Sequence, residues 1–269
     1  MTPFPDFHIA LRLALRVRFF SISFWLLVAL GIIVWTASQF SGRQPATVAL
    51  DVGLSVIRLA LPIVAVLLLQ ELLSQEFTRK LFLTSMTYPR ARHWFLLGRF
   101  LAAFLLVLVL LSVLAALLAA LVTVIGQGYK QSTPVALDLR YGITIAFIAV
   151  DIGVIMAMGT LLAVTAATPS FVLIGTLGFM LVARSFSAIV ALLSRDSTLV
   201  GDAETYRLSL NLLGYFLPDL AALDVRMITL YGQMAFLPPD WVVRLSATIA
   251  YAVGLIALAV WALNRKRFA

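Results

Sequence analysis

Long apolar runs, separated by short polar stretches, recur along the whole chain. Several of these runs reach the roughly 20 apolar residues that a helix needs to cross a hydrocarbon core of about 30 Å. Because lipid offers the backbone no hydrogen-bond partners, each run is predicted to cross as an α-helix. The predicted spans cover residues 19–40, 52–69, 94–125, 141–165, 171–193 and 241–263. The pattern therefore predicts an all-α membrane protein with six transmembrane helices, built as a single transmembrane domain over residues 1–269.

Two segments outside the spans have patterns of their own. Residues 1–18 mix apolar side chains with arginines, which is typical of an interfacial helix whose basic groups reach anionic headgroups. A cleaved signal peptide is the competing interpretation, but the apolar run that follows is longer than the roughly 7–15 residues of such peptides. Residues 194–240 form the longest stretch between spans and are broken by Pro218. This stretch is predicted to be a re-entrant or interfacial segment at the outer side of the membrane.

Residues 70–93, between the second and third spans, are rich in charge in a chain of which only 12% is charged. The charged residues of this segment are Glu71, Glu76, Arg79, Lys80, Arg90 and Arg92. Its apolar residues fall near helical spacing, so the first part is predicted to be an amphipathic helix at the membrane surface. Pro89 is predicted to end that helix, because the residue before a proline is pushed out of the α region. The alternative is a solvated loop with ordinary basic residues.

The net charge of +8 comes from basic residues whose positions predict how the spans are oriented in the membrane. In a soluble protein such a charge would point to nucleic acid, but here hydrophobic residues make up 62% of the chain and the mean hydropathy is +1.05. Basic residues gather in both tails and in residues 70–93, as expected for the cytoplasmic side of a membrane protein. Both termini are therefore predicted to be cytoplasmic, and no nucleic-acid partner is expected.

The residues that usually carry enzyme chemistry are sparse. The chain has no cysteine, and its histidines, His8 and His93, are far apart and lie in no acid–histidine pattern. No lysine follows a glycine as in a phosphate-binding loop. We therefore expect no catalytic residue, no metal site and no cofactor bound by this chain.

Three charged residues fall inside the predicted spans: Arg58, Asp151 and Arg184. An unpaired charge near the middle of a bilayer costs several kcal/mol, so Asp151 should face the bundle interior, a cavity or a cation. Arg184 is the first candidate partner by depth and Arg58 the second, although Arg58 could instead extend its head group to the interface. The cluster is either a structural ion pair or a substrate or gating contact.

The order of motifs around residues 70–99 resembles that of the membrane subunits of type-2 ABC exporters. An acidic residue on an amphipathic helix is followed by Pro-x-x-Arg and by Phe-Leu-Leu-Gly-basic at the start of a long span. The matching residues are Glu76, Pro89, Arg92, Gly98 and Arg99. The family also often has Leu-Pro-Asn/Asp-Leu and Asp-x-Arg before its last span, which here are Leu217 to Leu220 and Asp224 to Arg226. One departure is Thr78-Arg79-Lys80, where many relatives have Gly-Thr.

This resemblance implies a permease subunit that forms a homodimer in a bacterial inner membrane. Within the family, the chain most resembles the permeases found near copper-enzyme maturation systems. A separate cytoplasmic ATPase would bind ATP and Mg²⁺ and dock on residues 70–93 as a coupling helix. The implied docking residues are Glu71, Glu76, Arg79, Lys80, Pro89, Arg90 and Arg92. The alternatives are a secondary transporter that needs no ATPase and a membrane scaffold subunit.

Overall fold

The computed structural model describes residues 7, 11–12, 19–74, 92–128, 135–166, 168–195 and 217–265. These residues form helices, with no strand among them, and six of the helices are long and apolar enough to cross a membrane. The long helices are α2 Phe19–Phe40, α3 Pro45–Leu69, α6 Arg92–Gln127, α7 Leu139–Thr165, α8 Pro169–Arg195 and α11 Trp241–Arg265. The short ones are the π-helix η1 Gln70–Ser74, the 3-10 helices η3 Ala221–Leu223 and η4 Met234–Phe236, and α10 Arg226–Tyr231. The prediction of an all-α membrane protein is confirmed.

Helix α3 begins seven residues before the predicted span that starts at residue 52. Pro45 stands in its first turn, where a missing N–H costs nothing and the fixed φ favours a helix. Ala46 and Leu50 are fully buried and extend the apolar face of the helix. Asp51 lies within α3 rather than in a loop. Its charge is neutralised there, because its carboxylate lies 2.9 Å from the Arg226 guanidinium.

The other predicted spans differ from the helices by no more than a few residues. Helix α6 has 36 residues, or about 54 Å at 1.5 Å per residue, so it is longer than the hydrocarbon core is thick. The fourth and fifth predicted spans are separate helices, because α7 ends at Thr165 and α8 starts at Pro169. The predicted interfacial helix of residues 1–18 lies outside the described residues, apart from residues 7, 11 and 12. Residues 75–91 of the predicted coupling region 70–93 also lie outside them.

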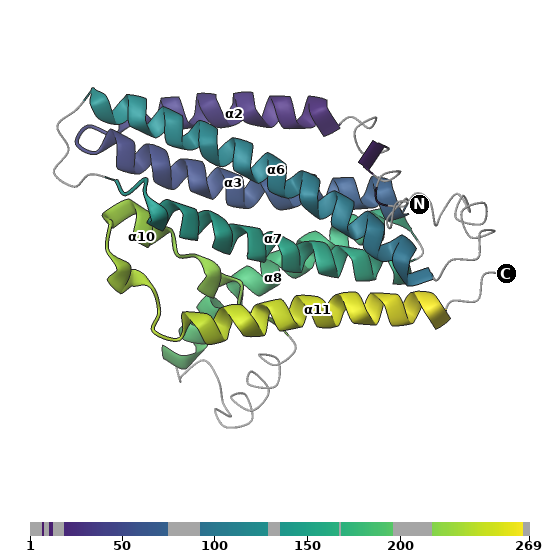
Figure 1. Ribbon diagram of the computed structural model, residues 1–269. Helices are drawn as coiled ribbons and strands as arrows, with labels where there is room; N and C mark the ends of the chain where they lie inside the picture. Colours follow the sequence, from purple (N-terminus) through teal and green to yellow (C-terminus); the bar gives the residue numbers. More distant parts are fainter. Residues whose placement is uncertain are drawn as a thin grey trace.

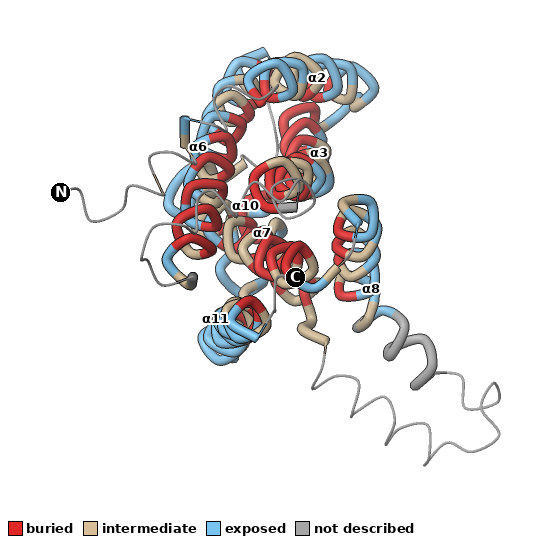
Figure 2. Tube along the Cα trace, turned by 90° about the vertical axis from the view of Figure 1, so that its right-hand side faces the viewer, coloured by how far each residue is buried: buried red, intermediate tan, exposed pale blue. Residues whose placement is uncertain are grey.

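The helices run roughly alongside one another in a bundle, and α2 begins at the end where α11 finishes (Figure 1). We call this the terminal end, and the end where α2 finishes and α3 begins the opposite end. Helices α3 and α7 occupy the middle, whereas α2 and α11 lie at the periphery with broad exposed faces (Figure 2). Over half of the apolar window of α3 and of α7 is buried, 56% in each, against 22% for α2 and 17% for α11. The centre of the bundle is therefore α3 packed against α7.

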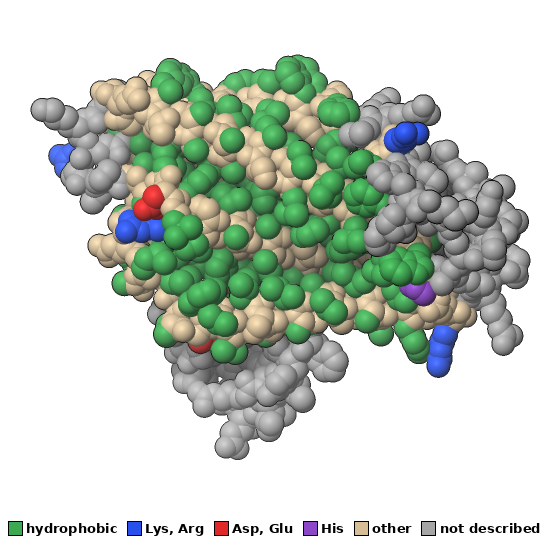
Figure 3. Space-filling model, in the orientation of Figure 1, with side chains coloured by type: hydrophobic (Ala, Val, Ile, Leu, Met, Phe, Trp, Pro, Cys, Tyr) green, Lys and Arg blue, Asp and Glu red, His purple; other side chains and the backbone are tan. Residues whose placement is uncertain are grey.

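The distribution of side chains on the surface fits a membrane environment. Apolar side chains cover the middle of the face shown in Figure 3, and charged side chains lie toward its ends. Large apolar residues are exposed on the peripheral helices, for example Trp25 on α2 and Trp261 on α11. This apolar band is what a lipid-facing surface requires.

Residues 217–236, which we call the re-entrant segment, fold back against the bundle from the opposite end. The segment contacts α3, α7 and α8, and it buries Leu220, Leu223 and Ile228 almost completely. Gly232 ends α10 with φ +66°, a conformation that favours glycine. Irregular backbone at membrane depth is tolerated where protein buries it, as here. Residues 217–236 belong to the stretch predicted to be re-entrant or interfacial, and residues 196–216 of that stretch lie outside the described residues.

Candidate functional site

The three charged residues predicted inside the spans meet in the centre of the bundle. The Asp151 carboxylate is 1% exposed, and its Oδ2 atom lies 2.5 Å from Arg184 Nη2 and 3.4 Å from Arg58 Nε. Arg184 is the closer partner, as depth alone predicted. Arg58 also faces the interior rather than the interface, because its side chain is only 14% exposed. One carboxylate thus holds two guanidinium groups.

These residues come from three different helices and lie at the same depth. Arg58 on α3, Asp151 on α7 and Arg184 on α8 are each about 16–20 Å along their helices from the opposite end, at 1.5 Å per residue. Since each helix is roughly 40 Å long, this depth is close to the middle of the bundle. The ion pairs therefore tie three spanning helices together where water is scarce.

Pro62 explains the position of Arg184. A proline inside a helix has no N–H for the carbonyl four residues earlier, and for Pro62 that carbonyl belongs to Arg58. Arg184 Nη1 donates a hydrogen bond to this Arg58 oxygen at 2.9 Å. A neighbouring helix therefore supplies the donor that Pro62 removes from α3, which is how membrane proteins tolerate such prolines.

The re-entrant segment adds further partners from a part of the chain that the sequence analysis did not connect with this site. Asp224 Oδ2 lies 2.5 Å from Arg58 Nη1, and Arg58 Nη2 donates to the Leu220 carbonyl at 2.7 Å. The Leu220 N–H in turn donates to the Ala183 carbonyl of α8 at 3.2 Å. The only signal for this contact in the sequence was the Asp-x-Arg motif that begins at Asp224.

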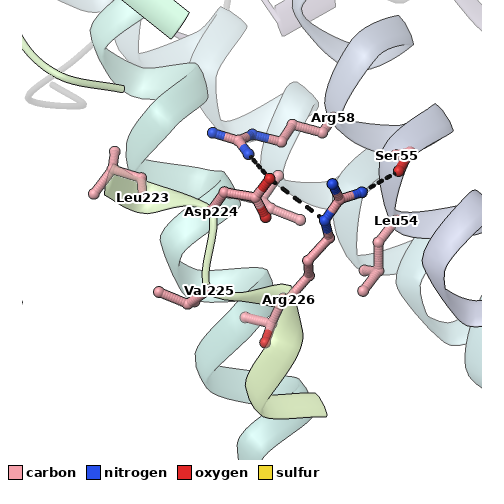
Figure 4. Close-up of a pocket in the computed structure, with 9 residues that line it drawn as sticks. Leu54, Ser55, Arg58, Leu223, Asp224, Val225 and Arg226 are labelled. Atoms are coloured by element: carbon pink, nitrogen blue, oxygen red, sulfur yellow. Dashed lines mark hydrogen bonds and ion pairs between the residues drawn. The ribbon is translucent and has the colours of Figure 1, made fainter. Parts of the chain in front are cut away.

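Arg226 extends the network toward the opposite end. Its guanidinium lies 3.5 Å from Asp224 and 2.9 Å from Asp51, and it donates to Ser55 Oγ at 2.5 Å. Figure 4 shows the Asp224 carboxylate between the Arg58 and Arg226 guanidiniums, with Arg226 reaching across to Ser55 on α3. We call the whole set the charge cluster; its members are Asp51, Arg58, Asp151, Arg184, Asp224 and Arg226.

The cluster is balanced in charge and graded in exposure. It has three arginines and three aspartates, and exposure of the carboxylates rises from 1% at Asp151 through 28% at Asp224 to 46% at Asp51. The deep end also holds polar atoms that are buried without a hydrogen-bond partner among the described residues, Asp151 Oδ1 and Arg184 Nε. The cluster is therefore a path of charged groups that starts deep in the bundle and opens toward the opposite end.

A small pocket lies beside the outer part of this path (Figure 4). It holds about 10 Å³, close to the volume that one water molecule needs. Its polar and charged lining residues are Ser55, Arg58, Thr144, Asp224 and Arg226. Thr144 and Thr229 join α7 to α10 next to it, with their hydroxyl oxygens 2.6 Å apart.

The two predicted docking residues that the structure describes, Glu71 and Arg92, lie at the terminal end, away from the cluster. Glu71 lies half-buried in η1 and Arg92 is the first residue of α6, while Glu76, Arg79, Lys80, Pro89 and Arg90 lie outside the described residues. Arg99, only 5% exposed, donates a hydrogen bond to the Leu72 carbonyl of η1 and stacks over the Phe95 ring at 4.3 Å. The helices that flank the docking segment on both sides are therefore joined to each other.

The comparison with known proteins gives no identification. No model of a known protein family matches the chain, and no curated protein matches it. Two features of the structure bear on the function: the charge cluster, and the joined ends of η1 and α6.

Proposed function

We propose that this chain is the transmembrane permease subunit of an ABC transporter, which moves a substrate across the membrane with ATP hydrolysed by a separate subunit. The observation that carries the proposal is the joint between η1 and α6 at the terminal end. Arg99 of α6 holds the Leu72 carbonyl, and Leu72, Leu73 and Leu96 are fully buried around it. A partner that pushes on residues 70–93 would therefore move α3 and α6 together.

Helix α3 leads from this joint to the charge cluster. Leu72 and Arg58 are about 21 Å apart along the helix, with Pro62 between them. Because a proline interrupts the hydrogen-bond ladder, α3 can change its bend at this point more easily than elsewhere. ATP binding by the partner would then shift the bundle between two packings, with the charge cluster at the pivot.

The orientation and assembly follow from the same proposal. Basic residues such as Arg12, Arg99 and Arg265 belong to the terminal end, which would be the cytoplasmic side of a bacterial inner membrane. The resemblance to type-2 ABC exporters implies two copies of this chain and two ATPase subunits. ATP and Mg²⁺ would be bound by the ATPase.

A secondary transporter is the second candidate, and the burial of Asp151 favours it. Ionisable residues at mid-membrane often line proton or ion pathways, and Asp151 is 1% exposed between two arginines. Uptake of an ion or proton into proteoliposomes by the purified chain alone would support this candidate. Transport that needs both the ATPase and ATP would support the permease, and a chain that transports nothing but assembles partners would be a scaffold.

Copurification tests the docking proposal directly. The chain would be coexpressed in turn with candidate Walker-motif ATPases of the same organism, and the ATPase bound per permease would be measured after affinity purification. Glu71→Arg, and separately the pair Glu76→Arg with Arg92→Glu, should lower this ratio at least about tenfold, since charge reversal replaces attraction by repulsion. Unchanged copurification in both variants would reject docking on residues 70–93.

A charge reversal at the opposite end provides the matched control. Asp240 and Arg244 form an exposed ion pair of 2.8 Å beside α11, far from the terminal end. Replacing Asp240 by arginine changes the surface charge of the chain as much as Glu71→Arg does. This control should leave the copurified ATPase unchanged, and a loss equal to that of Glu71→Arg would show a general charge effect.

A further inference from the structure

The spanning helices bring an unequal number of charges to the middle of the bundle. Arg58 and Arg184 contribute two positive charges, whereas Asp151 contributes one negative charge. Asp51 on α3 does not correct this difference, because it lies about 10 Å along the helix from Arg58 and contacts Arg226 instead. Without the re-entrant segment, the deep part of the cluster would therefore carry one positive charge too many.

Asp224 supplies the missing negative charge, and it comes from the part of the fold that does not span the membrane. Its carboxylate forms ion pairs with Arg58 Nη1 at 2.5 Å and with Arg226 Nε at 3.5 Å. Asp224 stands between η3 and α10, on backbone without regular helix. It is 28% exposed and lines the pocket of Figure 4, whereas Asp151 is 1% exposed.

We infer that the position between the Arg58 and Arg226 guanidiniums is a binding site for a carboxylate-bearing ligand, which Asp224 occupies in this structure and yields when such a ligand enters. Guanidinium groups bind carboxylates with short, directed hydrogen bonds, and two of them already converge here. The inference that carboxylates are the transported substrates rests on the proposed transport function. The binding of a carboxylate at this position does not require an ATPase.

The charge count favours a monoanion. One negative charge neutralises the excess positive charge of Arg58 and Arg184 over Asp151. The charge of Arg226 stays neutralised by its ion pair with Asp51. A doubly charged phosphate would leave one negative charge unpaired in the bundle, which burial disfavours. Formate should therefore bind better than inorganic phosphate at equal ionic strength and at an alkaline pH, where phosphate is mostly doubly charged.

Because the pocket is small, Asp224 and a carboxylate ligand cannot occupy the position at the same time. At about 10 Å³ it has room for one water, so a carboxylate ligand fits only after Asp224 leaves. Asp224 leaves with the re-entrant segment, which Thr229 fastens to Thr144 of α7. Fixing this contact should therefore close the site.

The first test is chemical rescue of Asp224→Ala, which removes the carboxylate and leaves the space that it filled. Its melting temperature in lipid-free detergent should fall below that of the wild type, and formate should restore most of the loss where chloride or phosphate does not. The matched control is Asp240→Ala, which removes the carboxylate from an exposed pair with Arg244. No recovery with formate, or the same response in the control, would overturn the inference.

The second test keeps Asp224 in place and so does not depend on the folding of that variant. The chain has no cysteine, so Thr144→Cys with Thr229→Cys introduces a single pair that can form a disulfide. Formate binding would be followed by saturation-transfer NMR. We expect saturable binding after reduction and at least tenfold weaker binding after oxidation. Equal binding in both forms, or no binding in either, would overturn the inference while leaving ATPase docking untouched.

Discussion

Replacing Asp151 by leucine should destabilise the fold by leaving Arg184 without a counter-charge. Asp151 contacts both Arg184 and Arg58, but Arg58 also holds Asp224 at 2.5 Å, so Arg184 suffers the larger loss. Removing one partner of a buried ion pair costs about 3–5 kcal/mol, because the remaining charge stays buried and unpaired. We expect Asp151→Leu to lower the free energy of unfolding by about this amount.

A second and a third substitution separate the contributions. Arg184→Leu in the Asp151→Leu background removes the stranded charge, but it also removes the donor to the Arg58 carbonyl. That carbonyl has no partner within α3 because of Pro62, so a loss of about 1–3 kcal/mol should persist. Adding Pro62→Ala supplies the missing N–H. Stability should therefore rise from the single to the double to the triple variant.

The measurement is reversible unfolding of the detergent-solubilised protein by SDS, followed by circular dichroism. The control is Asp240→Leu, which removes an exposed carboxylate at the end of the bundle and should unfold like the wild type. If Asp151→Leu unfolds like the wild type, or if the triple variant is no more stable than the single one, the account of the buried ion pairs is refuted.

Three other predictions concern packing, the joint and the topology. A Cβ atom on Gly53 would overlap the Leu118 side chain, so Gly53→Ala should destabilise by about 1–3 kcal/mol, and the combination with Leu118→Ala should cost less than the sum in SDS unfolding; additive losses would contradict this contact. Arg99→Leu leaves the Leu72 carbonyl without this buried donor and should cost about 1–3 kcal/mol in the same assay, with no loss counting against the joint. A cysteine replacing Thr84 should be labelled only from the cytoplasm, whereas labelling from outside would invert the topology.

The spans and the pairing of Asp151 with Arg184 could be predicted because each rests on a local property. The length of each hydrophobic run predicts a span. The positions of Asp151 and Arg184 along their two spans place both charges at the same depth. The predicted span of residues 52–69 starts too late because Asp51 is charged and so falls outside the apolar run. Its partner Arg226 is far away in the sequence, so no local pattern reveals that this charge is neutralised within the fold.

The outer half of the charge cluster could not be predicted for the same reason. Asp224 reaches Arg58 only because the chain turns back into the bundle before its last span, and the sequence shows this turn only as a break near Pro218. The role of Pro62 was hidden as well, since a proline in an apolar run does not disclose which side chain takes the place of its N–H. Contacts between distant segments require the packing, which local patterns leave open.

The central claim is that work done on residues 70–93 by an ATPase reaches the charge cluster and the re-entrant segment. ATP turnover by the reconstituted complex tests it, with Thr144→Cys and Thr229→Cys fastening the segment to α7. We predict that oxidation slows ATP turnover at least about fivefold and that reduction restores it, while the wild type responds to neither treatment. Equal turnover by the oxidised and reduced complexes, or an ATPase that neither binds nor responds to this chain, would contradict the account.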